Sequence, residues 1–213
     1  MIHVYGLVDE LAELPPTRGL DDAPLERRWI EGLEVVLSRA ETPPSAEVSR
    51  EAVLRHAQVV EELMARSGAV LPAQLGRAFR DEAELAAALQ EQAAQLVRGL
   101  ERVRGCVEFG LRAVGEPGVE PEATTGAEYM RARLEQVRRQ DALVAALHDP
   151  LAGLARESTL HRDAADEVRA AYLVPRDAIS AFRETAERVA ASPGLTVVCT
   201  GPWPPYSFAA AER

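Results

Sequence analysis

Apolar residues near the start of the chain follow the short period of a β-sheet. Ile2–Val8 carries apolar side chains on both faces, which is typical of a central strand covered on both sides. Two more strands are expected at Leu25–Ile30 and Leu33–Ser38, separated by Glu31-Gly32. Because glycine tolerates a positive φ, this dipeptide favours a tight hairpin. The pattern therefore predicts a sheet before the first helix.

The next apolar residues recur at helical spacing. Ser45 and Ser49 are both acceptable N-caps for this helix, and Gly68 is expected to end it. The positions that we expect to face the core are Val53, Ala57, Val60, Leu63 and Met64. They would pack the helix against the sheet.

A second and longer helix is predicted after a short extended segment, Val70–Pro72. Asp81 and Glu84 have the spacing of a capping box at its start. A stripe of leucines continues to Val103, and Gly105 is expected to break the helix. The first half of the chain thus combines strands with two helices.

The second half is expected to run strand, helix, strand, helix, strand. Thr125 and Glu128 form another capping box, Asp149-Pro150 is expected to restart that helix, and Asp177 is expected to cap the next one. The expected strands are Val107–Ala113, Val168–Val174 and Leu195–Thr200. This order is the core of a ferredoxin-like sheet with helices on one face.

The chain is therefore predicted to have an α+β fold made of α/β layers in two small domains. We expect an N-terminal domain at residues 1–104, a β-sheet with helices related to the second domain. A ferredoxin-like domain (βαβαβ) is expected at residues 105–199, followed by a proline-rich and aromatic tail at residues 200–213.

Composition narrows the class of protein. The chain has 213 residues, of which 47% are hydrophobic and 27% charged, as in globular proteins. No apolar run approaches the roughly 18 residues of a membrane span, and the N-terminus lacks the basic region of a signal peptide, so we expect a cytoplasmic protein with no membrane partner. A net charge of −10 argues against a nucleic-acid partner, because phosphate binding needs a basic surface.

The side chains that usually carry chemistry form no recognisable motif. There is no lysine, which excludes a phosphate-binding P-loop and Schiff-base chemistry. Cys106 and Cys199 lie far apart in the sequence, and buried free thiols are expected rather than a disulfide or a metal pair. The histidines lack partners at ligand spacing and are expected in surface or capping positions: His3, His56, His148 and His161. We therefore expect no metal, no cofactor and no enzymatic activity.

The segment between the two N-terminal helices is a candidate binding loop. Pro72 and Gly76 favour an irregular linker, and Arg77 and Arg80 could each donate two hydrogen bonds to a carboxylate. Either the arginines pair locally within a turn, or the loop contacts a partner.

A second candidate lies at the C-terminal end. Three prolines are expected to lead the chain away from the last strand, because proline cannot donate to a sheet. The tail residues with candidate roles are Trp203, Pro204, Pro205, Tyr206 and Phe208. They could fold back and seal the core, or offer a preformed aromatic surface to a partner, and the two roles can coexist.

Several short segments together resemble the gas vesicle protein GvpL/GvpF family. They follow the family order over roughly residues 1–208: Val4–Val8, His56–Met64, Leu71–Phe79, Gly105–Gly110, Ala171–Val174 and Thr200–Phe208, the last with the sequence Thr-Gly-Pro-Trp-Pro-Pro-Tyr-Ser-Phe. The linker departs from the family pattern, since Gln74 and Leu75 stand where arginine and phenylalanine are usual, and the loop at Gly115–Pro121 is short. A partner contact made by that family arginine would be lost here.

This resemblance implies a two-domain accessory protein of gas vesicle formation. Its implied partners are the small hydrophobic major shell protein and other gas vesicle accessory proteins. It would assist nucleation or assembly, as a chaperone or a minor structural component, in the cytoplasm or at the gas vesicle. Two alternatives remain open: a generic protein-interaction scaffold, and a small-molecule-binding ferredoxin-like enzyme or sensor.

Overall fold

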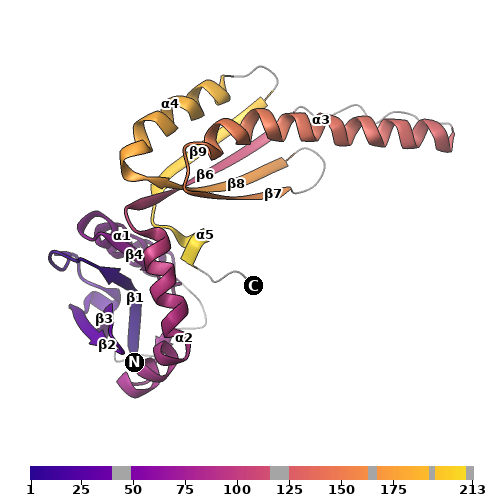
Figure 1. The fold of residues 1–213 in the computed structure, drawn as a ribbon. Helices are drawn as coiled ribbons and strands as arrows, with labels where there is room; N and C mark the ends of the chain where they lie inside the picture. Colours follow the sequence, from indigo (N-terminus) through magenta and orange to yellow (C-terminus); the bar gives the residue numbers. More distant parts are fainter. Residues whose placement is uncertain (40–48, 116–124, 163–166, 192–194, 210–213) are drawn as a thin grey trace. The chain divides into compact units, whose positions relative to one another are not determined.

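The structure, a computed structural model, describes residues 1–39, 49–115, 125–162, 167–191 and 195–209. The chain divides into two compact units (Figure 1). Unit 1 contains residues 1–107 and also 203–213, and unit 2 contains residues 108–202. The boundaries between the units fall after Val107 and before Trp203, near the domain bounds of 104 and 199 expected from the sequence. Trp203 and the residues after it belong to unit 1.

The sheet of unit 1 has β1 at its centre. Its strands are β1 (Ile2–Asp9), β2 (Leu25–Ile30), β3 (Leu33–Arg39), β4 (Ala69–Pro72) and β5 (Ala78–Phe79). Their order is β2-β3-β1-β4, with β5 also pairing with β1, and the pairs involving β1 are antiparallel. Residues Ile2–Val8 are all buried, which confirms the predicted central strand. The predicted hairpin is also confirmed, because Glu31 and Gly32 both adopt positive φ between β2 and β3.

Two helices cover the opposite faces of this sheet. They are α1 (Arg50–Arg66) and α2 (Glu82–Val103), and a short helix, α5 (Tyr206–Ala209), and a 3-10 turn, η1 (Leu20–Asp22), complete unit 1. Val70 of β4 packs in one hydrophobic cluster with Val59, Val60 and Leu63 of α1. The side chain of the next residue, Leu71, abuts Gly99 of α2. Adjacent strand residues point to opposite faces, so the sheet lies between the two helices.

Unit 2 is built from one four-stranded sheet and two helices. Its elements are β6 (Cys106–Gly115), α3 (Gly126–Ala152), β7 (Glu157–Arg162), β8 (Glu167–Pro175), the 3-10 turn η2 (Arg176–Ala178), α4 (Ile179–Ala190) and β9 (Leu195–Trp203). The strand order is β7-β8-β6-β9. α3 and α4 contact each other and lie on one side of the sheet (Figure 1). The β-α-β-β-α-β succession is that of ferredoxin-like domains.

The centre of unit 2 is aromatic. The ring of Phe182 on α4 lies 4.8 Å from that of Phe109 on β6 and 5.3 Å from that of Tyr172 on β8. These three side chains are fully buried. They hold α4 on the sheet, because large aromatic side chains contribute more buried area than any others.

The predicted α+β class is confirmed, and several local predictions are wrong. β7 was not expected, and it carries the exposed His161. α3 runs without interruption from Gly126 to Ala152, so Asp149-Pro150 does not restart it. β9 continues to Trp203 through Pro202, since it is an edge strand in which a missing N–H is tolerated.

The ends of two other helices also differ from expectation. α1 does begin after Ser49, whose hydroxyl accepts from the Ala52 N–H, but it ends at Arg66 with an extended Ser67 rather than at Gly68. Val53, expected to face the core, is exposed, and His56 takes a core position instead. Asp177 lies inside η2 and does not cap α4.

Candidate interaction surfaces

The C-terminal tail packs back onto unit 1 as a fixed element. α5 contacts α2 and β4, and Phe208 on α5 is buried. The guanidinium of Arg102, in the last turn of α2, lies 5.7 Å from the centre of the Phe208 ring. Pro204 and Pro205 are also buried, and their carbonyls accept hydrogen bonds from the N–H groups of Tyr206 and Phe208. Residues 203–209 of the tail therefore have a defined conformation before they meet any partner.

Two aromatic side chains of this tail remain accessible. Trp203 is 44% exposed and Tyr206 is 38% exposed, although both are close to the buried Phe208 in sequence. Burial of the hydroxyl, assisted by the Glu61 carboxylate, raises the pKa of Tyr206 to about 12. Its phenol is neutral at physiological pH, as that of an unperturbed tyrosine is, and can donate a hydrogen bond. Trp203 and Tyr206, which we call the tail aromatics, form a rigid amphipathic surface.

The linker between α1 and α2 is partly inside the fold. Pro72 ends β4 and is paired with Gly6 of β1. Gly76 is exposed with a φ of +89°, a conformation that favours glycine. The Arg77 guanidinium lies 5.9 Å from the centre of the Phe79 ring. Arg77 is thus an exposed cation over an aromatic ring at the end of the linker.

Arg80 makes the local contact that the sequence offered as one alternative. Its side chain pairs with Glu84 at 3.1 Å, and its N–H donates to the same carboxylate at 2.7 Å. These hydrogen bonds lower the pKa of Glu84. The predicted capping box forms only in part: the Asp81 carboxylate accepts from the Glu84 N–H, but the Glu84 carboxylate accepts from the Arg80 N–H and not from that of Asp81. Arg80 remains exposed but already has a carboxylate partner.

The two candidate groups lie at opposite ends of α2. Arg80 precedes its first turn, and Phe208 contacts Arg102 in its last turn. With a rise of 1.5 Å per residue, the 18 residues between Glu84 and Arg102 separate the groups by about 27 Å. The structure therefore offers two separate surfaces on unit 1, not one site.

A buried polar network in unit 1 was missed from the sequence. His3 and His56, expected in surface or capping positions, are both buried, with His3 Nε2 3.0 Å from His56 Nδ1. His56 Nε2 lies 2.9 Å from the Ala73 carbonyl and must donate to it, so its Nδ1 accepts from His3. The His56 ring also stacks on Tyr5, at 5.3 Å between ring centres.

Burial sets the charge of this histidine pair. It lowers the pKa of His3 to about 4, with a further contribution from His56. Burial also lowers the pKa of His56, opposed by its hydrogen bond to Ala73. Both rings are therefore neutral near pH 7. Two features of the sequence could have predicted this buried pair. His56 occupies an apolar position of the predicted helix, and His3 lies on the predicted central strand.

Other features bear on the alternative of a small-molecule site. A hollow of about 440 Å³ on α1 is lined by Arg50, Glu51, Leu54, Arg55 and Gln58, all exposed or half-buried. Small-molecule sites usually enclose their ligands among buried apolar and polar groups, which this hollow does not supply. In the part of the chain that the structure describes, no group of three or more His, Cys, Asp or Glu side chains could hold a metal ion.

Two further findings concern the state of the cysteines and the ability of the helices to cross a membrane. Cys106 is buried, Cys199 is half-buried, and neither forms a disulfide. Among the described residues, none of the helices combines the length and the apolar character needed to cross a membrane.

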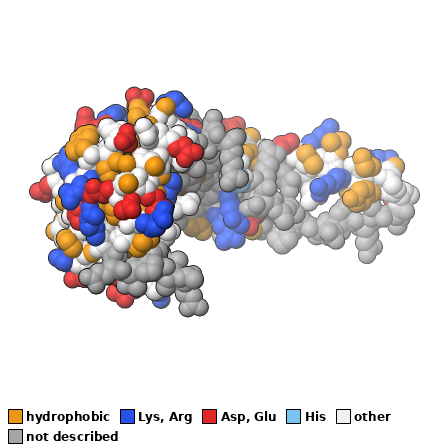
Figure 2. All heavy atoms as spheres, turned by 90° about the horizontal axis from the view of Figure 1, so that it is seen from below, with side chains coloured by type: hydrophobic (Ala, Val, Ile, Leu, Met, Phe, Trp, Pro, Cys, Tyr) orange, Lys and Arg blue, Asp and Glu red, His pale blue; other side chains and the backbone are white. Residues whose placement is uncertain are grey.

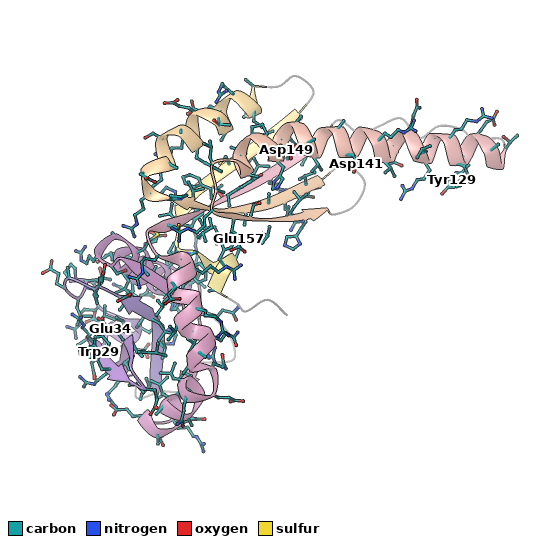
Figure 3. The ribbon with its side chains drawn as sticks, in the orientation of Figure 1. Trp29, Glu34, Tyr129, Asp141, Asp149 and Glu157 are labelled. Carbon is teal, nitrogen blue, oxygen red and sulfur yellow. The ribbon has the colours of Figure 1, made fainter. Side chains whose placement is uncertain are left out.

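Large apolar side chains are exposed on both units. Trp29 on β2 is 66% exposed and lies opposite Glu34 of β3, which is buried and ion-paired with Arg27 (Figure 3). Tyr129 lies near the beginning of α3, together with three exposed apolar neighbours (Figure 3). These four residues of α3 are Tyr129, Met130, Leu134 and Val137.

The comparisons with known proteins agree with this fold. Residues 1–210 match the sequence model of the gas vesicle synthesis protein GvpL/GvpF family. Gas vesicle protein L of Streptomyces sp. (strain CB03234) is 37% identical over 65% of this chain and 62% of its own length. Gas vesicle protein F2 of Halobacterium salinarum is 30% identical over 97% of this chain and 91% of its own length. The crystal structure of GvpF from Anabaena sp. PCC7120 has a TM-score of 0.83 at 21% identity, covering 100% of this chain and 97% of that one.

The fold and its surfaces define a class: two-unit α+β proteins with exposed aromatic and apolar side chains on both units. The chain belongs to the gas vesicle synthesis protein GvpL/GvpF family. The resemblance noted in the sequence is thereby confirmed over nearly the whole chain.

Proposed function

We propose that this protein is a non-enzymatic accessory factor of gas vesicle formation that binds the small hydrophobic shell subunit through the tail aromatics. Family membership supports the process, and the conformation of the tail supports the surface. Trp203 and Tyr206 are exposed on a segment that Phe208 fixes to unit 1. This arrangement is the observation on which the proposal rests.

The chemistry of the two partners is complementary. A very apolar, sheet-forming subunit is prone to aggregate before it joins a shell. Aromatic side chains cover apolar surface over a large area, and little conformational entropy is lost because the tail is already ordered. The net charge of −10 would help to keep such a complex in solution. Binding in the cytoplasm and release at the growing vesicle would assist nucleation or assembly.

Point substitutions test this proposal better than removal of the tail, because truncation also removes the buried Phe208. We would co-purify the full chain with the gas vesicle shell subunit, comparing the wild type with a Trp203→Ala/Tyr206→Ala variant. Light scattering would report the aggregation of the shell subunit in the same mixtures. We expect the double variant to retain its fold and to lose at least about tenfold in affinity, as for two aromatic contacts in an interface.

Trp29→Ala is the matched control. Trp29 is more exposed than either tail aromatic, lies in the same unit, and is not part of the tail. It should leave binding unchanged. If the Trp203→Ala/Tyr206→Ala variant binds the shell subunit with the affinity of the wild type, the proposed surface is refuted. If the wild-type chain neither binds the shell subunit nor alters its aggregation, the proposed partner is refuted.

A further inference from the structure

The described side chains of the first half of α3 are exposed or half-buried. The helix has 27 residues, and its buried residues Val144, Leu147 and Leu151 all lie in the second half. Among the described side chains of residues 126–138, none is buried. Figure 1 shows this half of α3 extending past the strands and past α4 of unit 2.

An apolar line nevertheless continues along the exposed half. Met130, Leu134 and Val137 follow the i, i+4, i+7 spacing of one helix face, and they are 66%, 51% and 40% exposed. Val137 and Met130 are also seven and fourteen residues before the buried Val144, so they extend the same seven-residue line outward. Contiguous exposed apolar side chains of this kind mark contact surfaces. We call Met130, Leu134 and Val137 the α3 stripe.

Arginines flank this stripe on both sides. At 100° per residue, Arg131 and Arg138 lie about 80–100° from Met130 on one side, and Arg133 lies about 60° away on the other. All three are exposed, and Arg133 donates to Gln136 at 3.0 Å. In Figure 2 this end of the helix carries hydrophobic side chains next to arginine side chains.

The acidic residues of this half are placed differently. Glu128 and Glu135 lie about 140–160° from Met130, on the opposite face of the helix. The two sides of the stripe therefore carry positive charge, although the exposed Asp141, about 20° from Met130, places a carboxylate at its end beyond Val137 and the whole chain carries a net charge of −10. A partner seated on the stripe would meet guanidinium groups at its edges.

We propose that the α3 stripe binds an amphipathic helix of another protein whose own apolar line is flanked by carboxylates. An α-helix offers no free backbone groups along its side, so a strand would gain nothing there, whereas a second helix can interdigitate its side chains. Carboxylates opposite Arg131, Arg133 and Arg138 would complete the edges of the contact, as charges flanking a helix pair do.

A second copy of this chain fits the stripe less well. Two α3 stripes facing each other would bring arginines of both copies to the same edges, and like charges across an interface are unfavourable. The contact is short, since Met130 to Val137 spans about 10 Å of helix, so binding would belong to the weak, transient class. This surface lies on unit 2 and is independent of the proposed binding of the shell subunit.

Two designed helical peptides test the proposal with the full chain. Both carry the same leucine line, one flanked by glutamates and the other by lysines, and each bears a fluorophore for anisotropy titration. We expect the glutamate peptide to bind at least tenfold more tightly than the lysine peptide, with an affinity that falls as salt is added. An Arg131→Glu/Arg138→Glu variant should reverse this preference.

Variants of the stripe and of the opposite face complete the experiment. Leu134→Gln/Val137→Gln, at exposed positions and with unchanged circular dichroism, should weaken binding of the glutamate peptide at least tenfold. Glu128→Gln/Glu135→Gln should not weaken it. Equal binding of the two peptides, no binding of either, or unaltered binding by the stripe variant would overturn the proposal. So would sedimentation showing that wild-type chains self-associate and that the stripe variant does not.

Discussion

His3 and His56 show how one buried pair makes the stability of unit 1 depend on pH. Burial lowers the pKa of both rings, that of His3 to about 4, whereas an unfolded chain titrates its histidines near 6.5. Between these values the unfolded state binds more protons than the folded state. The free energy of unfolding must therefore fall as the pH drops from about 6.5 towards 4.

The expected loss can be measured by urea unfolding at pH 7 and pH 5. His3 alone should lower the free energy of unfolding by about 2 kcal/mol over this interval, and His56 should add to it. A His3→Gln variant can still donate to His56, and it should lose about 2 kcal/mol less than the wild type over the same interval. His161→Gln, at an exposed position, is the control and should behave as the wild type does. An identical loss in wild type and His3→Gln would contradict the role of His3.

At the scale of single residues, the sequence predicted features that depend on neighbouring residues and missed contacts between distant ones. The hairpin at Glu31-Gly32 was predictable because the turn depends only on those two residues and their flanking strands. The contact between His3 and His56 joins residues 53 positions apart, and no local pattern specifies it. Arg80 was predictable only in part. Its pairing with Glu84 is a local i, i+4 contact, which was one of the two alternatives that the sequence left open.

Among the elements, those with a one-sided apolar pattern were predictable and those without it were not. β6 and β8 alternate clearly and were expected, whereas β7 has one apolar residue, Leu160, in Glu157–Arg162. β7 is an edge strand paired only with β8, so it needs no buried face of its own. The predicted restart of α3 at Asp149-Pro150 was wrong because Pro150 lies in the last turn of the helix. The buried Leu147 and Leu151 hold the helix in place there.

The N-cap of α3 should matter more than an average cap, since none of the described side chains in the first half of this helix is buried. Thr125 and Glu128 form the reciprocal capping box expected from the sequence, with hydrogen bonds of 3.3 and 3.0 Å. A Thr125→Ala substitution should cost about 1 kcal/mol of local stability. Amide hydrogen exchange in the first turns of α3 should then accelerate about fivefold, while exchange in α4 is unchanged.

Ser180→Ala is the matched control for the capping prediction. Ser180 is exposed near the start of α4, a helix that lacks a side-chain cap. Its substitution should leave exchange in both helices close to the wild-type rate. If Thr125→Ala left the exchange of α3 unaltered, contacts other than the cap would have to stabilise its exposed half.

At the scale of the whole molecule, unit 1 is completed only by the last part of the chain. Residues 203–213 return to it after the continuous unit 2, and Phe208 closes the packing of α5 on α2 and β4. Phe208→Ala should therefore destabilise unit 1 by about 3–5 kcal/mol, as expected for a buried phenylalanine. Hydrogen exchange should accelerate in β4 and the last turns of α2 while β8 and α4 keep their protection. Tyr206→Ala, two residues earlier and 38% exposed, should change these rates much less. Equal loss of protection in both units after Phe208→Ala would mean that they unfold together, and the tail would then stabilise the whole chain. If only unit 1 responds, and responds much less to Tyr206→Ala, the fold of unit 1 depends on Phe208 far more than on Tyr206. Any loss of shell-subunit binding in the Trp203→Ala/Tyr206→Ala variant could then be assigned to the contact surface itself.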